Sequence, residues 1–192
     1  MILTPDNEYT VVLDACVLAP MPICDLLLHL ATEPATFRPV WSVQILDEVR
    51  KTLVERFGYP VSKANRRIDA MSQFFPEASV KVPDVLISAV PNMPDPSDRH
   101  VVAAGIRGKA HQILTKNLRH FPQTVLSDFG LEAVSPDEFL VNQFHLNPGL
   151  VLEKLDAQAT DIRRERLHII RLLRDLHQAV RFADLVEQRT QS

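Results

Sequence analysis

The chain carries YTVVLDA at residues 9–15, a short apolar run rich in β-branched side chains. Such a run is typical of a strand that is buried on both faces, as in the parallel sheets of α/β proteins. Asp14 is the one charged residue in the run and lies at its carboxyl end. The stretch therefore predicts a buried strand that ends at a carboxylate.

Outward from this strand, short apolar segments alternate with segments of helical periodicity. Further strands are expected at 37–41, 79–82 and 112–115, with weaker candidates at 124–127 and 131–135. Helices are expected at 22–33, after an N-cap at Ser42, at 62–75, at 98–108, and after a capping box formed by Ser135 and Glu138. This alternation predicts an α/β fold with a mainly parallel central sheet.

The pattern changes after Asn147. Residues 148–189 have no strand signal, and apolar residues recur at helical spacing, at Leu167, Ile170, Leu173, Leu176 and Val180. We expect a helical C-terminal appendage of two helices, broken near Thr160–Asp161. The predicted division is a domain at 1–146 and an extension at 147–192.

Composition sets the broad class of the protein. The chain has 192 residues, of which 46% are hydrophobic and 23% are charged, as in one ordinary globular domain with an appendage. It has no apolar run of about 18 residues and no basic segment before an apolar stretch at its start. We therefore expect no membrane span, no signal peptide and a cytoplasmic location.

Charge and cysteine content exclude two kinds of site. The net charge of −3 disfavours a protein that holds nucleic acid by bulk positive charge. An enzyme that reaches phosphates through a bound cation escapes this objection. Cys16 and Cys24 lack the spacing of a zinc site and are expected to be reduced and buried.

Four polar residues are expected at one edge of the sheet. Asp14 ends the first strand, Asn117 follows the strand at 112–115, and Asp98 begins the helix before that strand. Glu48 flanks the apolar stripe of its helix. Ligands bind outside the carboxyl ends of parallel strands, and clustered carboxylates repel unless a cation offsets their charge. The set predicts a site for Mg²⁺ or Mn²⁺, which prefer oxygen ligands.

Each of these residues also has an interpretation without function. Asp14 and Asn117 are common turn residues, and Asp98 in a first helical turn is a favourable partner of the helix dipole. Glu48 fits an ion pair with Lys51 on a solvated face. Their joint placement on one sheet edge is what favours a site.

Four segments together resemble the motif blocks of the PIN domain family: VVLDACVL, ILDEVRKTL, PDPSDRHVVAAGI and ILTKNLRHFP. Their order and spacing match over residues 10–145, and the last two blocks resemble the subgroup that includes VapC-type toxins. The resemblance implies a three-layer α/β/α fold and a Mg²⁺- or Mn²⁺-dependent endoribonuclease. The tail resembles the helical extension of a longer toxin subgroup.

The resemblance also implies roles for individual residues. Asp14, Asp98 and Glu48 match the acidic metal-binding positions, and Asn117 falls where many toxins have Asn. One residue departs from the motif, and a second could be confused with the ligand Asp98. His120 stands where relatives often have another acid, which leaves a second metal open, and Asp95 belongs to the same block as Asp98.

Substrate and partner are implied less directly. Arg99, Lys116 and Arg119 lie beside the proposed site, and Arg163 and Arg164 lie in the tail. These residues are expected to contact RNA phosphates; the alternative is solvated or internally paired surface charge. The family resemblance implies a small VapB-like antitoxin in a type II toxin–antitoxin pair. Exposed apolar residues on the tail or the first two helices would fit that partner or a homodimer.

Two other functions compete with this interpretation. A PIN-like adaptor that binds RNA or protein without catalysis is the main alternative, and the intact acidic set argues against it. A haloacid-dehalogenase phosphatase also ends its first strand with Asp, but its chemistry needs a second Asp two residues later, where this chain has Cys16.

Overall fold

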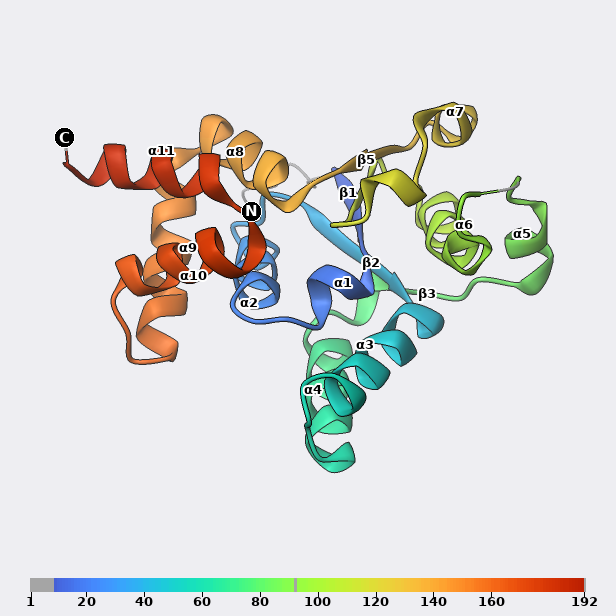
Figure 1. Ribbon diagram of the computed structural model, residues 1–192, viewed down its shortest axis with the longest axis horizontal. Coiled ribbons are helices and arrows are strands. Elements are labelled where there is room, and N and C mark those ends of the chain that lie inside the picture. The colour runs from blue at the N-terminus through green and yellow to red at the C-terminus, as the bar shows by residue number, and fades with distance from the viewer. Residues whose placement is uncertain (1–8, 92, 192) are drawn as a thin grey trace, which may run out of the picture.

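The computed structural model describes residues 9–91 and 93–191, and Figure 1 shows its elements in chain order. The strands are β1 Thr10–Leu13, β2 Arg38–Ser42, β3 Ser79–Val80, β4 Gln112–Leu114 and β5 Glu132–Val134. They form one sheet in the order β3-β2-β1-β4-β5, and every neighbouring pair is parallel. The expectation of a mainly parallel sheet is confirmed.

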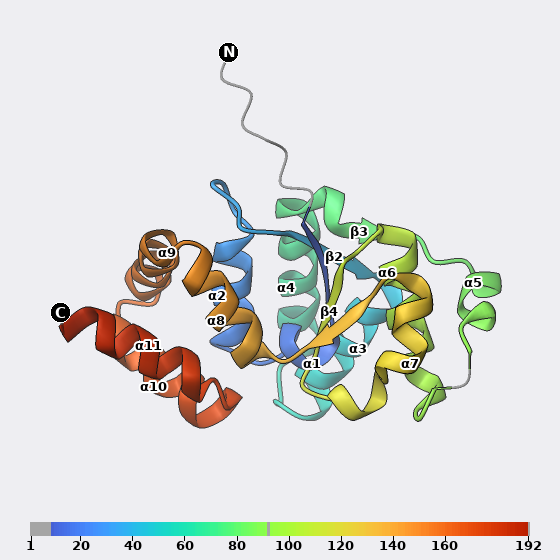
Figure 2. The same ribbon diagram turned by 90° about the horizontal axis from the view of Figure 1, so that it is seen from above.

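Helices cover both faces of this sheet. The first seven are α1 Ala15–Leu18, α2 Ile23–Leu30, α3 Val43–Glu55, α4 Val61–Phe74, α5 Asp84–Ala89, α6 Arg99–Gly108 and α7 Gln123–Leu126. The last four are α8 Pro136–Leu146, α9 Pro148–Asp161, α10 Arg166–His177 and α11 Val180–Gln191. Figure 2 shows α2 and α8 on one side of the strands and α6 on the other. This arrangement confirms the three-layer α/β/α fold with a helical C-terminal part.

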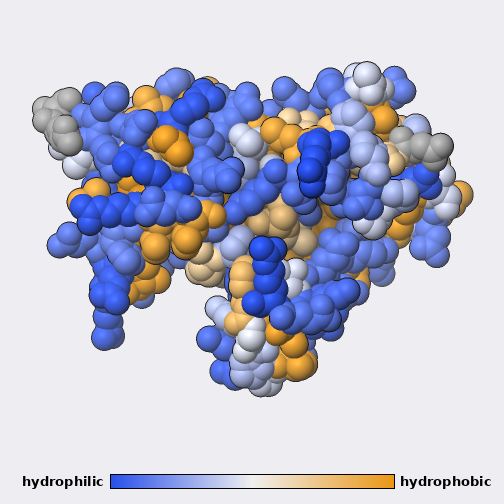
Figure 3. Space-filling view, in the orientation of Figure 1, coloured by the Kyte–Doolittle hydropathy of each residue, from blue (hydrophilic) through white to orange (hydrophobic). Residues whose placement is uncertain are grey.

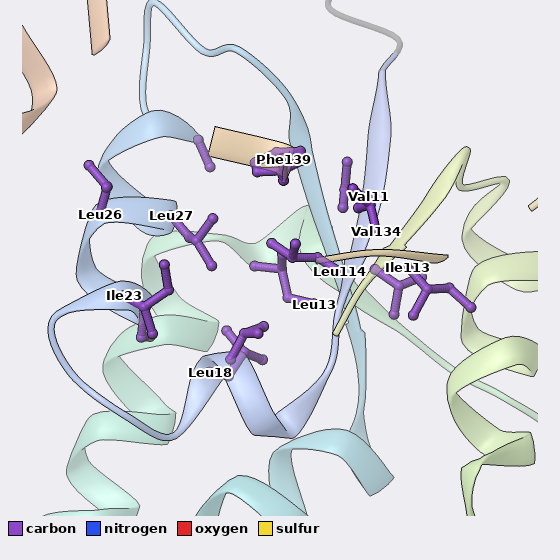
Figure 4. Packing of buried hydrophobic residues seen from close by; sticks show 14 of the residues in the cluster. Val11, Leu13, Leu18, Ile23, Leu26, Leu27, Ile113, Leu114, Val134 and Phe139 are labelled. Carbon is purple, nitrogen blue, oxygen red and sulfur yellow. The ribbon is translucent and has the colours of Figure 1, made fainter. Parts of the chain in front are cut away.

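The first strand is buried on both faces, as its composition predicts. Val11, Val12 and Leu13 have no exposed surface. Figure 4 shows Leu13 beside Leu18 and Leu27, on the face that α1 and α2 cover. Each such side chain contributes about 1.5–3 kcal/mol on burial, so this layer stabilises β1 in the centre of the sheet.

Two glycines let α6 lie close to the opposite face. A Cβ added at Gly108 would lie 2.8 Å from a methyl carbon of Val40, and one at Gly105 would lie 3.0 Å from the side chain of Leu131. The helix can therefore approach the sheet only where it lacks side chains. This close packing brings the start of α6 near the ends of β1 and β4.

Two details differ from the sequence-based expectations. Residues 123–126 form helix α7 instead of a strand, because the carbonyl of Pro122 accepts hydrogen bonds from Val125 and Leu126 and so starts a helical turn. The extension has three helices instead of two. The break after Asp161 is where it was predicted, but Gln178 adopts a left-handed conformation (φ 56°) that ends α10 and adds a second break.

The extension docks on α2 through buried polar contacts as well as apolar ones. Lys154 on α9 is 6% exposed, and its ammonium donates to the carbonyl of Thr32 at 2.9 Å, to the Thr32 hydroxyl and to the carbonyl of Glu33. These acceptors lie just past the carboxyl end of α2, where a cation is favourable. The predicted domain boundary at residue 147 stays a prediction, since α8 itself packs against α11.

Two expectations concern the membrane and the start of the chain. Among residues 9–91 and 93–191, no helix is long and apolar enough to cross a membrane. The expected lack of a signal peptide concerns residues 1–8, which lie outside the described residues.

Replacing Lys154 tests how the extension is attached. Lys154→Ala should lower the free energy of unfolding by about 1–3 kcal/mol, because it removes the three hydrogen bonds that the buried lysine donates. Urea unfolding followed by circular dichroism measures the change. Lys81→Ala, at an exposed lysine, is the control. Equal stability of the two variants would contradict the role given to Lys154.

Candidate active site

A cleft of about 910 Å³ lies at the carboxyl ends of β1 and β4, and all four predicted site residues line it: Asp14, Glu48, Asp98 and Asn117. In Figure 3 the surface is notched between the C-terminal helices and the lobe formed by α3 and α4. The lining of the cleft includes Arg56 at the end of α3 and His177 at the end of α10, so both parts contribute to it. The structure thus gathers the predicted set in one place.

Asp14 is held rigidly at the centre of the sheet edge. It is only 5% exposed, and its Oδ2 accepts hydrogen bonds from the Thr115 hydroxyl at 2.6 Å and from the Cys16 thiol at 3.0 Å. The Thr115 oxygen in turn accepts from the backbone N–H of Asn117 at 3.1 Å. One oxygen of Asp14 is thereby used for positioning, which leaves Oδ1 as the expected ligand atom.

Cys16 is part of this arrangement, which the sequence did not indicate. Both cysteines are free thiols, as expected, but only Cys24 is fully buried, and Cys16 lines the cleft. Burial, together with the neighbouring Asp14 carboxylate, raises the pKa of Cys16 to about 12. The group therefore stays a neutral thiol and acts as a donor to Asp14.

Asp98 lies at the start of α6 and is half-buried. Its Oδ2 accepts a hydrogen bond from His120 Nδ1 at 2.8 Å. Burial raises the pKa of Asp98, the bond from His120 opposes this rise, and Asp14 and Asp95 add to it. The carboxylate is therefore in a place where its charge costs free energy unless a cation is nearby.

Asp95 is placed differently from Asp98. It caps the short turn Pro96–Asp98, where its Oδ1 accepts from the backbone and hydroxyl of Ser97. These bonds lower the pKa of Asp95. Asp95 does not belong to the lining of the cleft. This geometry agrees with the preference for Asp98 as the ligand.

Glu48 is held by a residue that sequence reasoning missed. Its Oε1 lies 2.9 Å from Nε2 of His100, which is 8% exposed on α6. Among the described residues, the Glu48 side chain forms no ion pair or hydrogen bond with the side chain of Lys51 or Thr52. His100 belongs to the same motif block as Asp98, but its contact with Glu48 depends on how α3 packs against α6.

The donor set fits a hard divalent cation. Asp14, Glu48 and Asp98 supply carboxylates and Asn117 an amide oxygen, and all four line one cleft. A tighter group is formed by Asp95, Asp98 and His120, whose ligand atoms all lie within 4.8 Å of one another. Asp14, Glu48 and Asp98 do not form such a group among the described residues. Asp98 is common to both sets.

The predicted RNA-contacting residues are not together. Lys116 lines the cleft, whereas Arg99, Arg119, Arg163 and Arg164 do not. Other tail arginines pair internally: Arg166 with Asp156, and Arg174 with Asp184 and Glu187. Two cationic side chains that were not predicted as RNA contacts, those of Lys51 and Arg56, also line the cleft.

The PIN domain family profile matches residues 10–119, the segment that contains every residue of the predicted metal site. The chain belongs to the PIN domain family. A second profile, the VapC50 C-terminal domain, matches residues 136–188. The chain thus combines a PIN domain with a C-terminal part of the VapC50 type, which confirms the predicted family and the longer VapC-type subgroup.

One curated relative of this PIN protein is the putative ribonuclease VapC50 of Mycobacterium tuberculosis (strain ATCC 25618 / H37Rv). The two are 44% identical over 64 residues, which cover 31% of this chain and 38% of the relative. The aligned part is therefore well under half of either protein. No solved structure matches the chain.

The raised pKa of Asp98 predicts a pH-dependent effect on stability. Ionised Asp98 is less favourable in the folded than in the unfolded chain, so its cost is absent below the unfolded pKa and complete above the folded pKa. Asp98→Asn should therefore stabilise the EDTA-treated protein, and this gain should appear as the pH rises from about 3.5 to about 7. Urea unfolding at several pH values measures it.

Asp95→Asn is the matched control. Because hydrogen bonds lower the pKa of Asp95, its ionised form stabilises the fold above the unfolded pKa. This variant should therefore lose stability as the pH rises toward the unfolded pKa, so that the loss is complete by about pH 5 and constant above it. If the difference in stability between Asp98→Asn and the parent did not change with pH, the argument from burial of Asp98 would be contradicted.

Proposed function

We propose that the protein is a Mg²⁺- or Mn²⁺-dependent endoribonuclease that hydrolyses RNA phosphodiester bonds, and that it is the toxin of a type II toxin–antitoxin pair. One observation carries the proposal: the four polar residues of the PIN motif blocks line a single cleft at the carboxyl ends of β1 and β4. The name of the VapC50 relative supports the same activity.

Each residue of the cleft has a distinct role in this proposal. Asp14 and Asp98 hold the metal, Glu48 places the metal or the attacking water, and Asn117 completes the ligand set. When bound, the ion would supply a charge that stabilises the phosphoryl group and lowers the pKa of water. His100, His120 and Thr115 act as positioning residues, since each hydrogen-bonds to one of the carboxylates.

The cations at the cleft fit a polyanionic substrate. Lys51, Arg56 and Lys116 line the same space as the carboxylates. They would contact phosphates and position RNA without reading its sequence. Contacts by Arg99, Arg119, Arg163 and Arg164 stay predictions; the last two are exposed in the loop after α9.

Apolar residues at the cleft support an antitoxin partner. Met21 and Phe57 are each 43% exposed, Leu176 is 60% exposed, and all three line the cleft. Exposed apolar groups beside polar ones are typical of protein interaction sites. A VapB-like antitoxin that covers them would also block the carboxylates. The same surface is compatible with a homodimer.

Removing single carboxylates tests the nuclease proposal. Asp14→Asn and Asp98→Asn should each lower the rate of Mn²⁺-dependent cleavage of a labelled RNA by at least about a hundredfold. Loss of a group that only orients a metal ligand already lowers activity about 10- to 100-fold, and loss of a ligand itself should lower it further. Asp69→Asn, at an exposed acid outside the cleft, should cleave like the parent. Undiminished cleavage by either cleft variant would refute the assignment. If the parent cleaves no RNA, a non-catalytic adaptor is favoured.

The Glu48–His100 pair gives a separate prediction about metal binding. His100→Leu removes the group that orients Glu48 and should weaken Mn²⁺ binding about ten- to a hundredfold. Isothermal titration calorimetry of the purified protein measures this without an activity assay. His145→Leu, at an exposed histidine on α8, is the control. Equal Mn²⁺ affinity of the two variants would show that His100 does not act on Glu48.

A further inference from the structure

The C-terminal extension reaches the candidate active site. Leu176 and His177, the last residues of α10, line the same cleft as Asp14 and Asp98. In Figure 1 the end of α10 lies beside the loop between α1 and α2, and the hydrogen bond of His177 to that loop agrees. One wall of the cleft thus comes from a segment outside the matched PIN domain, which ends at residue 119.

His177 joins this loop to a cation of the cleft. The side chain is only 4% exposed; its Nε2 lies 3.1 Å from the carbonyl oxygen of Met21, and its Nδ1 lies 2.8 Å from the Lys116 ammonium. A carbonyl only accepts, so Nε2 must carry the proton and donate it. Nδ1 is then the acceptor from Lys116. Both ring nitrogens are satisfied in one neutral tautomer.

Lys116 is tied to the acidic centre by its backbone. It follows Thr115 directly, and its backbone N–H donates to the thiol of Cys16 at 3.2 Å. A lysine side chain has a long flexible stem, which costs entropy to hold in one place. The bond to His177 fixes the ammonium, and two of its three donors remain for another acceptor.

The parts that hold His177 are themselves packed and hydrogen-bonded. Ile169, Ile170 and Leu173 of α10 are fully buried. The start of the loop that accepts from His177 is also held by Arg67, which donates to the carbonyls of Leu18 and Ala19 at 2.7 and 2.9 Å. The position of the Lys116 ammonium is therefore set by the packing of the extension on the PIN domain.

We propose that His177 is a positioning residue that fixes the Lys116 ammonium in the cleft, so that it binds a phosphate of the RNA held beside Asp14 and Asp98. The extension then forms part of the substrate-binding site. This inference rests on the proposed function for the identity of the ligand. It requires His177 to act only through Lys116.

A double-mutant cycle on RNA binding tests this coupling. Full-length Lys116→Ala, His177→Phe, the double variant and the parent are titrated with a fluorescein-labelled RNA hairpin in EDTA, where no cleavage interferes. Lys116→Ala and His177→Phe should each weaken binding about fivefold at about 0.1 M salt and reduce the salt slope by about 0.7, the effect of one lost phosphate contact. The double variant should bind no worse than Lys116→Ala.

Two further variants separate positioning from folding. His177→Gln keeps a donor and an acceptor and should restore binding close to that of the parent. His168→Gln, at an exposed histidine on the same helix, is the matched control and should change nothing. Circular dichroism of each variant records the fold. Where the parent cleaves RNA with Mn²⁺, His177→Phe should raise KM and leave kcat nearly unchanged.

Three results would overturn the inference: additive effects in the double variant, parent-like RNA binding by His177→Phe, or no RNA binding by the parent in EDTA. Failure of the proposed nuclease function looks different. In that case no variant, nor the parent, cleaves RNA with Mn²⁺, while the binding cycle still shows coupling between His177 and Lys116.

Discussion

The buried hydrogen bond from the Thr115 hydroxyl to Oδ2 of Asp14 joins the ends of two strands that are 101 residues apart in sequence. It is possible only because β1 and β4 are parallel neighbours, in the register Leu13 with Leu114. Parallel pairing places both carboxyl ends at one edge, and the packing of α6 on the sheet brings Asp98 to the same edge. The orientation of the central carboxylate follows from this one contact.

Around that contact, the site is built from pairs in which one residue orients another. Thr115 orients Asp14, His120 orients Asp98, and His100 orients Glu48. The orienting residues come from α6 and from the segment that follows β4. Carboxylates that are fixed in this way lose little conformational entropy when they bind a cation, which is how preorganised metal sites gain affinity.

Much of the fold and the gathering of the site residues could be predicted from sequence. β1 was recognisable because it is apolar on both faces, and Asp14 and Asp98 because their positions in a parallel sheet converge. The partner of Glu48 could not be predicted, since it depends on how α3 and α6 pack. Helix α7 was mistaken for a strand because a run of four residues with two β-branched side chains, Thr124 and Val125, does not distinguish the two when a proline starts the turn. The third helix of the extension was not predicted because the left-handed residue that ends α10 is Gln178. A glycine at this position would have indicated a helix end, whereas a glutamine does not.

Side chains of the extension attach it to the PIN domain by hydrogen bonds to backbone carbonyls of that domain. Lys154 binds the carbonyls of Thr32 and Glu33, Gln158 binds that of Pro22, and His177 binds that of Met21. Every residue type offers the same backbone carbonyl, so these contacts, unlike the bond of Lys154 to the Thr32 hydroxyl, do not depend on which side chains the loop carries. Substitutions at Met21 or at Glu33 would leave the docking intact. Side chains at the rim of the cleft can therefore be changed without loss of the hydrogen bonds that attach the extension.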